Sequence, residues 1–195
     1  MSTNPYAPPK AAVADVVPAE DVGLPFFAVS KKKLVIMSIA TGTLYQLVWF
    51  YSNWRQIQRR GEIAAPFMRT LFAPFFCYAL FSRVRRYRKE LPSGRLQAGL
   101  LALGWLATTL GGAFLSLFYD GDVRSSAIAL YVMSLFLSHA SVLFMLPVQN
   151  AAETINRVEA PDHDPNDRFT VWNWIWGAFF GFLAVANIAV VLATF

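Results

Sequence analysis

Two polar side chains, His139 and Asn187, lie inside long apolar runs of the sequence, where polar groups are costly unless they serve packing or function. His139 falls near the middle of the run 127–148, and Asn187 falls within the run 171–195. An imidazole there could carry protons or contact a polar substrate, as in a small transporter or channel component with a polar path through both residues. We expect instead that neutral His139 makes an interhelical hydrogen bond, because no second acid or base accompanies it in these runs.

Nucleophiles and metal ligands do not form a recognisable motif in the sequence. Cys77, the single cysteine, sits among aromatic residues and is expected to be an inert small side chain. The segment 159–167 carries several acidic residues and one histidine, but it lacks the turn glycine and distal glutamate of a calcium loop, and Pro165 interrupts it. We expect a solvated turn in which Asn166 or Asp167 caps the next helix. The prediction is no enzyme, no metal site and no cofactor.

Four runs of mostly apolar residues are long enough to cross a membrane: 34–51, 98–119, 127–148 and 171–195. An α-helix rises about 1.5 Å per residue, so about twenty residues cross the roughly 30 Å hydrocarbon layer. Composition agrees, since 15% of the residues are charged, against roughly 25% in soluble domains. In lipid, a helix satisfies its backbone hydrogen bonds internally. The predicted fold class is therefore all-α, a polytopic transmembrane helix bundle with four spanning helices.

The segment 67–84 is ambiguous between a short span and a helix at the membrane surface. Its uncharged part, 70–82, reaches only about 20 Å as a helix. Pro74 within it favours a helix start or a break over a helix interior. We expect an interfacial or re-entrant helix, and the alternative is a fifth span.

The distribution of Lys and Arg fixes most of the topology but leaves the side of the N-terminus open. With four spans or with five, twelve basic residues fall on the cytoplasmic side and five outside. Both arrangements place the segment 120–126 outside, the loop 149–170 inside and Phe195 at the outer face. The net charge of +5 is thereby explained without nucleic acid.

Basic residues are concentrated in the segment 52–97, which holds ten Arg and Lys around an aromatic-rich stretch and only two carboxylates, Glu62 and Glu90. Cations close to a membrane surface each gain about 1 kcal/mol from anionic lipid. The densest group, called the basic cluster below, could bind lipid headgroups or a protein partner, or it could merely set the orientation of the chain. It comprises Arg83, Arg85, Arg86, Arg88 and Lys89.

The domain organisation is expected to be simple. Five of the eleven prolines fall in the first thirty residues, which predicts a disordered tail over 1–30 followed by one membrane domain over 31–195. No apolar core follows a basic start in this tail, so it is not a secretory signal peptide.

Four stretches of the sequence resemble a family of small uncharacterised bacterial inner-membrane proteins. They are 41–54 (TGTLYQLVWFYSNW), 73–83 (APFFCYALFSR), 146–156 (LPVQNAAETIN) and 162–174 (DHDPNDRFTVWNW). The first stretch is also similar to a domain of unknown function with a Thr-Gly-x-x-Tyr-x-x-x-Trp span. The resemblance implies a location in the bacterial cytoplasmic (inner) membrane and implies no reaction.

The sequence therefore predicts a non-enzymatic, multi-pass membrane protein whose basic, aromatic cytoplasmic face contacts anionic lipids or a protein partner. Membrane lipids are the expected partners, and nucleic acid is not. Gly177 and Gly181 lie four residues apart on one face of the last run, a spacing that lets helices approach closely. We expect bundle packing there, and a homo-oligomer is the alternative.

Overall fold

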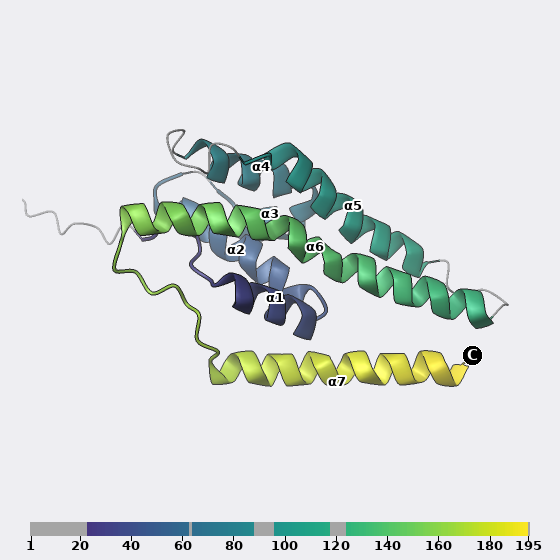
Figure 1. Cartoon of the computed structure of the whole chain (residues 1–195). Helices are drawn as coiled ribbons and strands as arrows, with labels where there is room; N and C mark the ends of the chain where they lie inside the picture. Colours follow the sequence, from purple (N-terminus) through teal and green to yellow (C-terminus); the bar gives the residue numbers. More distant parts are fainter. Residues whose placement is uncertain (1–22, 63, 88–95, 118–123, 195) are drawn as a thin grey trace, which may run out of the picture.

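The computed structural model describes residues 23–62, 64–87, 96–117 and 124–194 (Figure 1). Its regular secondary structure in these residues is α-helical and contains no strand, so the predicted all-α fold class is confirmed. Seven helices occur in the described part of the chain. They are α1 (Lys31–Ala40), α2 (Leu44–Arg59), α3 (Pro66–Leu71), α4 (Ala73–Arg86), α5 (Ala98–Ser116), α6 (Arg124–Glu159) and α7 (Val171–Thr194).

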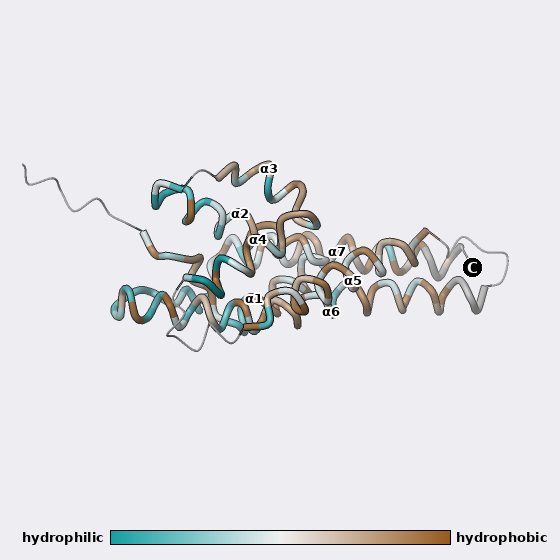
Figure 2. The backbone as a smooth tube through the Cα atoms, turned by 90° about the horizontal axis from the view of Figure 1, so that it is seen from above, coloured by the Kyte–Doolittle hydropathy of each residue, from teal (hydrophilic) through white to brown (hydrophobic). Residues whose placement is uncertain are grey.

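Three helices, α5, α6 and α7, are long and apolar enough to cross a membrane. They coincide with three of the four predicted runs. The first predicted span, 34–51, is not one helix, so the described residues offer three candidate spans rather than four or five. Figure 2 shows hydrophobic residues along one end of these helices and hydrophilic residues at the opposite end, where α2 and α6 terminate.

The first predicted span is broken by a turn at Thr41, Gly42 and Thr43. Gly42 and Thr43 both have positive φ angles, +58° and +75°, which end α1 and reverse the chain. The turn is closed by a hydrogen bond from the Thr43 amide to the Ser38 carbonyl at 2.8 Å. The Thr41 hydroxyl also accepts a hydrogen bond from the Tyr45 amide at 2.9 Å, at the start of α2. The Thr-Gly pair of the sequence motif therefore builds a helical hairpin.

The ambiguous segment 67–84 lies in α3 and α4, which meet at Phe72. Pro66 opens α3 and Pro74 lies in the first turn of α4, the helix positions that tolerate a missing N–H group. The two helices have 6 and 14 residues, and neither is among the three helices long enough to cross a membrane. They form a second pair of short helices beside α2.

Small residues on α5 allow α6 to pack against it along its length (Figure 1). A methyl group added at Gly112 would lie 2.9 Å from the backbone oxygen of Ser134, and one added at Gly111 would lie 2.9 Å from Leu137. At Gly104 it would meet the ring of Phe144. The α5–α6 contact therefore depends on the absence of side chains at these positions.

An aromatic cluster forms the core where α2, α4 and α5 converge. The ring of Phe50 lies 4.9 Å from that of Trp105 and stacks on Phe81 at 6.2 Å between centroids. Trp49 contacts Phe50 edge to face at 5.3 Å. All four side chains are buried, so this cluster joins the two short helix pairs to the long helices.

The extended segment 23–30 also belongs to the core, although the sequence assigns it to the tail. Phe26 and Val29 are 2% and 1% exposed. Of the predicted tail, residues 1–22 lie outside the described residues.

Helix α7 has few contacts with the rest of the chain. It lies beside α1, and no residue of its stretch Val171–Val190 is buried. The Tyr131 hydroxyl of α6 donates a hydrogen bond to Oδ1 of Asn187 at 2.6 Å. Gly177 lies near Ala40 of α1, whereas a methyl group at Gly181 would meet no atom within 4 Å.

Replacing Gly112 by alanine should destabilise the α5–α6 hairpin, because the added methyl group collides with backbone atoms that cannot rotate away. We expect a loss of about 1–3 kcal/mol, measured as a lower thermal unfolding temperature of the purified protein in detergent. Gly181→Ala is the matched control, since the position is open and alanine favours a helix over glycine. Equal losses in the two variants would contradict the close approach described here.

Candidate functional site

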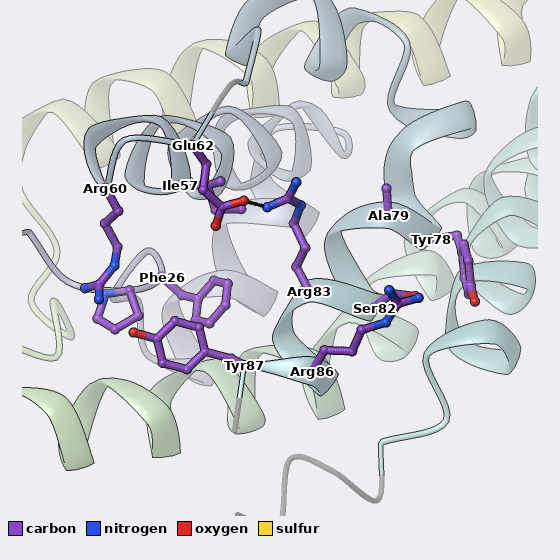
Figure 3. A pocket seen from close by; sticks show the side chains of 11 residues that line it. Phe26, Ile57, Arg60, Glu62, Tyr78, Ala79, Ser82, Arg83, Arg86 and Tyr87 are labelled. Carbon is purple, nitrogen blue, oxygen red and sulfur yellow. Dashed lines mark ion pairs between the residues drawn. The ribbon is translucent and has the colours of Figure 1, made fainter. Parts of the chain in front are cut away.

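A pocket of about 500 Å³ lies where the ends of α2 and α4 meet the segment 23–26 (Figure 3). Three arginines line it: Arg60 after the end of α2, and Arg83 and Arg86 in the last turn of α4. Cations at helix C-termini are favoured by the helix dipole, which explains why basic residues terminate both helices. We call this cavity the basic pocket.

Arg60 is held in place by its neighbours. Its Nη1 donates a hydrogen bond to the Gly23 carbonyl at 3.2 Å, and its guanidinium carbon lies 5.7 Å from the centre of the Tyr87 ring. Gly61, with φ +81°, ends α2 directly after it. The end of the helix therefore points this cation into the basic pocket.

Arg83 forms an ion pair with Glu62, the one carboxylate among the described residues that line the basic pocket. Its guanidinium group also lies 5.7 Å from the ring centre of Trp54, which is fully buried. Arg69 lies over the same ring at 4.5 Å. The charge of Arg83 is thus partly compensated within the protein, and its position is fixed by an aromatic ring.

Arg86 shares its end of the basic pocket with Tyr78 and Ser82 (Figure 3). A hydrogen bond with Ser82, together with the positive charges of Arg86 and Arg85, lowers the pKa of Tyr78 below its ordinary value. Positive potential at this end therefore favours anionic oxygen atoms. Three guanidinium groups facing one carboxylate make the pocket suitable for a phosphate or carboxylate ligand.

Exposed apolar side chains continue from the basic pocket along α3 and α4. Tyr78 lines the pocket and is 51% exposed, and Phe75, one turn earlier, is 80% exposed. Leu71, at the end of α3, is 62% exposed. A cationic pocket and an apolar surface are thus contiguous on one side of the molecule.

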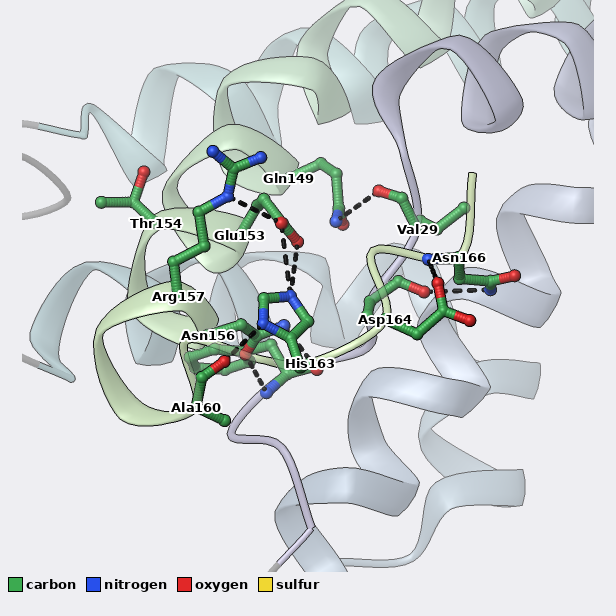
Figure 4. A network of polar contacts seen from close by, with 12 residues as sticks. Val29, Gln149, Glu153, Thr154, Asn156, Arg157, Ala160, His163, Asp164 and Asn166 are labelled. Atoms are coloured by element: carbon green, nitrogen blue, oxygen red, sulfur yellow. Dashed lines mark hydrogen bonds and ion pairs between the residues drawn. The ribbon is translucent and has the colours of Figure 1, made fainter. Parts of the chain in front are cut away.

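One wall of the basic pocket is held by amide side chains of α6 (Figure 4). Asn156 accepts a hydrogen bond from the Phe26 amide at 3.1 Å and donates one to the Phe26 carbonyl at 3.0 Å. Gln149 accepts from the Trp49 indole at 2.6 Å and donates to the Val29 carbonyl at 2.9 Å. Both amide side chains are buried. Asn156 thereby positions Phe26, which lines the pocket, and Gln149 holds the residues that follow it.

The segment 160–170 packs over the same region and does not form the predicted cap. Asn166 donates to the Ala28 carbonyl at 3.0 Å, and its Oδ1 accepts from Lys33 at 2.8 Å. Burial lowers the pKa of Lys33, and the carboxylates of Asp164 and Asp167 oppose this shift.

Thr170, rather than Asn166 or Asp167, caps α7. The Thr170 hydroxyl accepts a hydrogen bond from the Asn173 amide at 3.4 Å, and Oδ1 of Asn173 accepts from the Thr170 amide at 2.9 Å. This reciprocal arrangement is a capping box, with asparagine in the place of glutamate. The predicted cap is wrong because Asn166 has a left-handed backbone (φ +51°) and bonds to the segment before α1.

His163 bridges this segment to α6. Its Nδ1 lies 2.7 Å from the Ala160 carbonyl and must donate to it, since a carbonyl only accepts. Its Nε2 lies 3.3 Å from the Glu153 carboxylate, and it donates there only when the ring is protonated. Glu153 also pairs with Arg157 at 3.0 Å.

The structure divides the basic cluster. Arg83 and Arg86 line the basic pocket, whereas Arg85 does not, and both Arg85 and Arg86 are exposed. Arg88 and Lys89 lie outside the described residues. Sequence reasoning missed Arg60 as a pocket residue, because its role depends on the approach of two helix ends that are distant in sequence.

The polar residues singled out in the apolar runs do not lie together. His139 Nδ1 lies 2.7 Å from the Leu135 carbonyl of its own helix. Asn187 contacts Tyr131, which is about 12 Å from His139 along α6. A continuous polar path through His139 and Asn187 gains no support from these contacts.

The single cysteine and the potential metal ligands do not form a reactive or metal-binding site in the described residues. Cys77 is buried, and this burial raises the pKa of its thiol, as expected for an inert side chain. No group of three potential metal-ligating side chains occurs in the described part of the chain.

Comparisons with protein-family models, curated proteins and solved structures found no match. The resemblance to bacterial inner-membrane proteins stays a prediction.

Replacing Asn156 by alanine should unfold the wall of the basic pocket, because it removes the partners of the backbone N–H and C=O groups of the buried Phe26. We expect a loss of about 2 kcal/mol or more, seen as a lower unfolding temperature. Asn150→Ala removes an exposed hydrogen bond from Lys31 and should cost below about 0.5 kcal/mol. A larger effect at Asn150 than at Asn156 would refute the proposed role of the buried amide.

Proposed function

We propose that this protein is a non-enzymatic integral membrane protein that binds the anionic headgroup of a membrane lipid in its basic pocket. The observation that carries the proposal is a cavity lined by three arginines and one carboxylate, directly beside exposed apolar side chains. Arginine is suited to phosphate because its planar group donates two parallel hydrogen bonds. The apolar surface beside the pocket offers a place for acyl chains, which a soluble ligand does not need.

In the proposed topology α5, α6 and α7 span the membrane, and everything before α5 lies on the cytoplasmic side. The chain has 17 Lys and Arg, and Arg124, the first residue of α6, is the one at the outer ends of α5 and α6. The other sixteen are then cytoplasmic, a stronger bias than the twelve to five of the arrangements with four or five spans. The inner membrane of a bacterium is the proposed location, on the sequence resemblance alone.

The two pairs of short helices, α1–α2 and α3–α4, dip into the membrane from the cytoplasmic side in this proposal. The ten residues of α1 rise about 15 Å, half of the hydrocarbon layer. Apolar side chains near both tips are exposed, including Ile39, Leu44 and Phe72. Trp172, Trp174 and Trp176 at the start of α7 then lie at headgroup level. This depth puts the basic pocket beside lipid phosphates.

Binding of anionic lipid should depend on the arginines of the basic pocket. In the full-length protein, the double variant R60Q/R86Q should lose most of its preference for phosphatidylglycerol over phosphatidylcholine, because two phosphate-binding cations are removed. Retained lipid is measured by native mass spectrometry from detergent. Arg59→Gln, which removes an exposed charge outside the pocket, is the matched control. An unchanged preference for phosphatidylglycerol in R60Q/R86Q would contradict the proposal.

Cysteine accessibility distinguishes the proposed three-span topology from the four-span arrangement. In a Cys77→Ser background, a cysteine in place of the exposed Lys32 should be protected from a membrane-impermeant thiol reagent in intact cells, because the proposed topology puts residue 32 on the cytoplasmic side. A cysteine at Gly121 should be labelled. Labelling at position 32 would mean that the segment 34–51, within α1 and α2, crosses the membrane after all, and it would overturn the three-span topology.

A further inference from the structure

We infer that the basic pocket prefers a lipid with two phosphates joined by a short linker over lipids with one phosphate. Diphosphatidylglycerol, also called cardiolipin, represents this class. The inference rests on the proposed function and specifies its ligand. It is based on the positions of the three arginines within the pocket.

The cations of the basic pocket are separated into two ends. Figure 3 shows Arg60 at one end and Arg86 at the other, with the ion pair between Arg83 and Glu62 in between. Glu62 compensates Arg83, so the net positive charge of the pocket is divided between its ends. Among the residues that the structure describes, no second carboxylate lines the pocket, so one phosphate at either end leaves the opposite cation without an anion.

Each end has its own means of fixing an anionic group. At one end, Arg60 lines the pocket and is anchored through the Gly23 carbonyl and the Tyr87 ring, and a guanidinium group has further N–H donors beyond the one used there. At the other end, Arg86 lies with the hydroxyl groups of Tyr78 and Ser82. Each end thus combines a cation with an ordered or polar neighbour, as phosphate recognition requires.

The size of the basic pocket also fits a headgroup with two phosphates. Its volume of about 500 Å³ lies in the range of cavities that hold ligands of about drug size, which is larger than a single phosphate. Two linked phosphates occupy both ends at once, so binding at the second end becomes intramolecular and gains from effective concentration. The acyl chains leave along the exposed Tyr78, Phe75 and Leu71.

The test compares lipids that carry one or two phosphates, using the full-length protein in detergent. Cardiolipin, phosphatidylglycerol and phosphatidylcholine are titrated separately, with phosphatidylglycerol also at twice the molar amount so that phosphate is equal. Inorganic pyrophosphate is the soluble probe. Native mass spectrometry gives the apparent dissociation constants, and unfolding temperatures verify that every variant is folded.

Cardiolipin should bind at least about tenfold more tightly than phosphatidylglycerol, because both ends of the pocket are engaged. R60Q and R86Q should each reduce cardiolipin affinity to about that of phosphatidylglycerol, while each changes phosphatidylglycerol affinity by less than about threefold. R59Q should leave both unchanged. Arg60→Lys keeps the charge and should retain part of the preference, which separates loss of charge from loss of fold.

The outcomes distinguish failure of the inference from failure of the proposed function. Equal affinity for cardiolipin and for phosphatidylglycerol at equal phosphate, with both above phosphatidylcholine, overturns the two-phosphate inference and leaves the proposed function standing. Equal affinity for all three lipids overturns both. Pyrophosphate binding as tight as that of cardiolipin assigns the pocket to a soluble ligand and also overturns both.

Discussion

An extended stretch of backbone, residues 26–29, runs through the interior of this protein, and its peptide groups must find hydrogen-bond partners away from water. Asn156 and Gln149 of α6 and Asn53 of α2 supply them; the Phe27 amide, for example, donates to Oδ1 of Asn53 at 3.1 Å. Buried peptide groups left unpaired would each cost about 1–3 kcal/mol. The placement of the segment before α1 and the wall of the basic pocket depend on these hydrogen bonds, which also connect α2 and α6 through the segment between them.

Two of the four stretches that resemble a bacterial membrane family supply the hydrogen-bond partners of this buried backbone. Trp49 and Asn53 come from the first stretch, and Gln149 and Asn156 come from the third. They meet in one network although about a hundred residues separate them in the sequence. Gln46 extends it toward α5, where its Oε1 accepts from the Trp105 indole at 2.8 Å. These residues build the scaffold of the protein.

The sequence predicts some elements of this structure well and others poorly, for reasons that particular residues show. The three long helices are predictable because length and hydropathy are local properties. The break at Gly42 and Thr43 is not, because these residues hardly change the mean hydropathy while they reverse the backbone. Arg83 and Arg86 are visible as part of a charged run, but Arg60 joins them only through tertiary contacts. The cap at Thr170 has a local sequence signal, because Asn173 lies three residues later and completes the capping box. This pair caps α7 in place of the nearby Asn166 and Asp167.

The length of α6 has a mechanical consequence. Its 36 residues extend about 54 Å, well beyond a hydrocarbon layer of roughly 30 Å, and the helix continues through Pro147. A spanning helix adjusts its tilt to the thickness of the surrounding lipid. Figure 1 shows that α6 changes direction along its length, and Pro147 lacks the N–H group that would continue the hydrogen bonds of the helix there. In the proposed topology, this bend separates the part of α6 that follows the tilt imposed by the bilayer from its last turns, which hold Phe26 through Asn156.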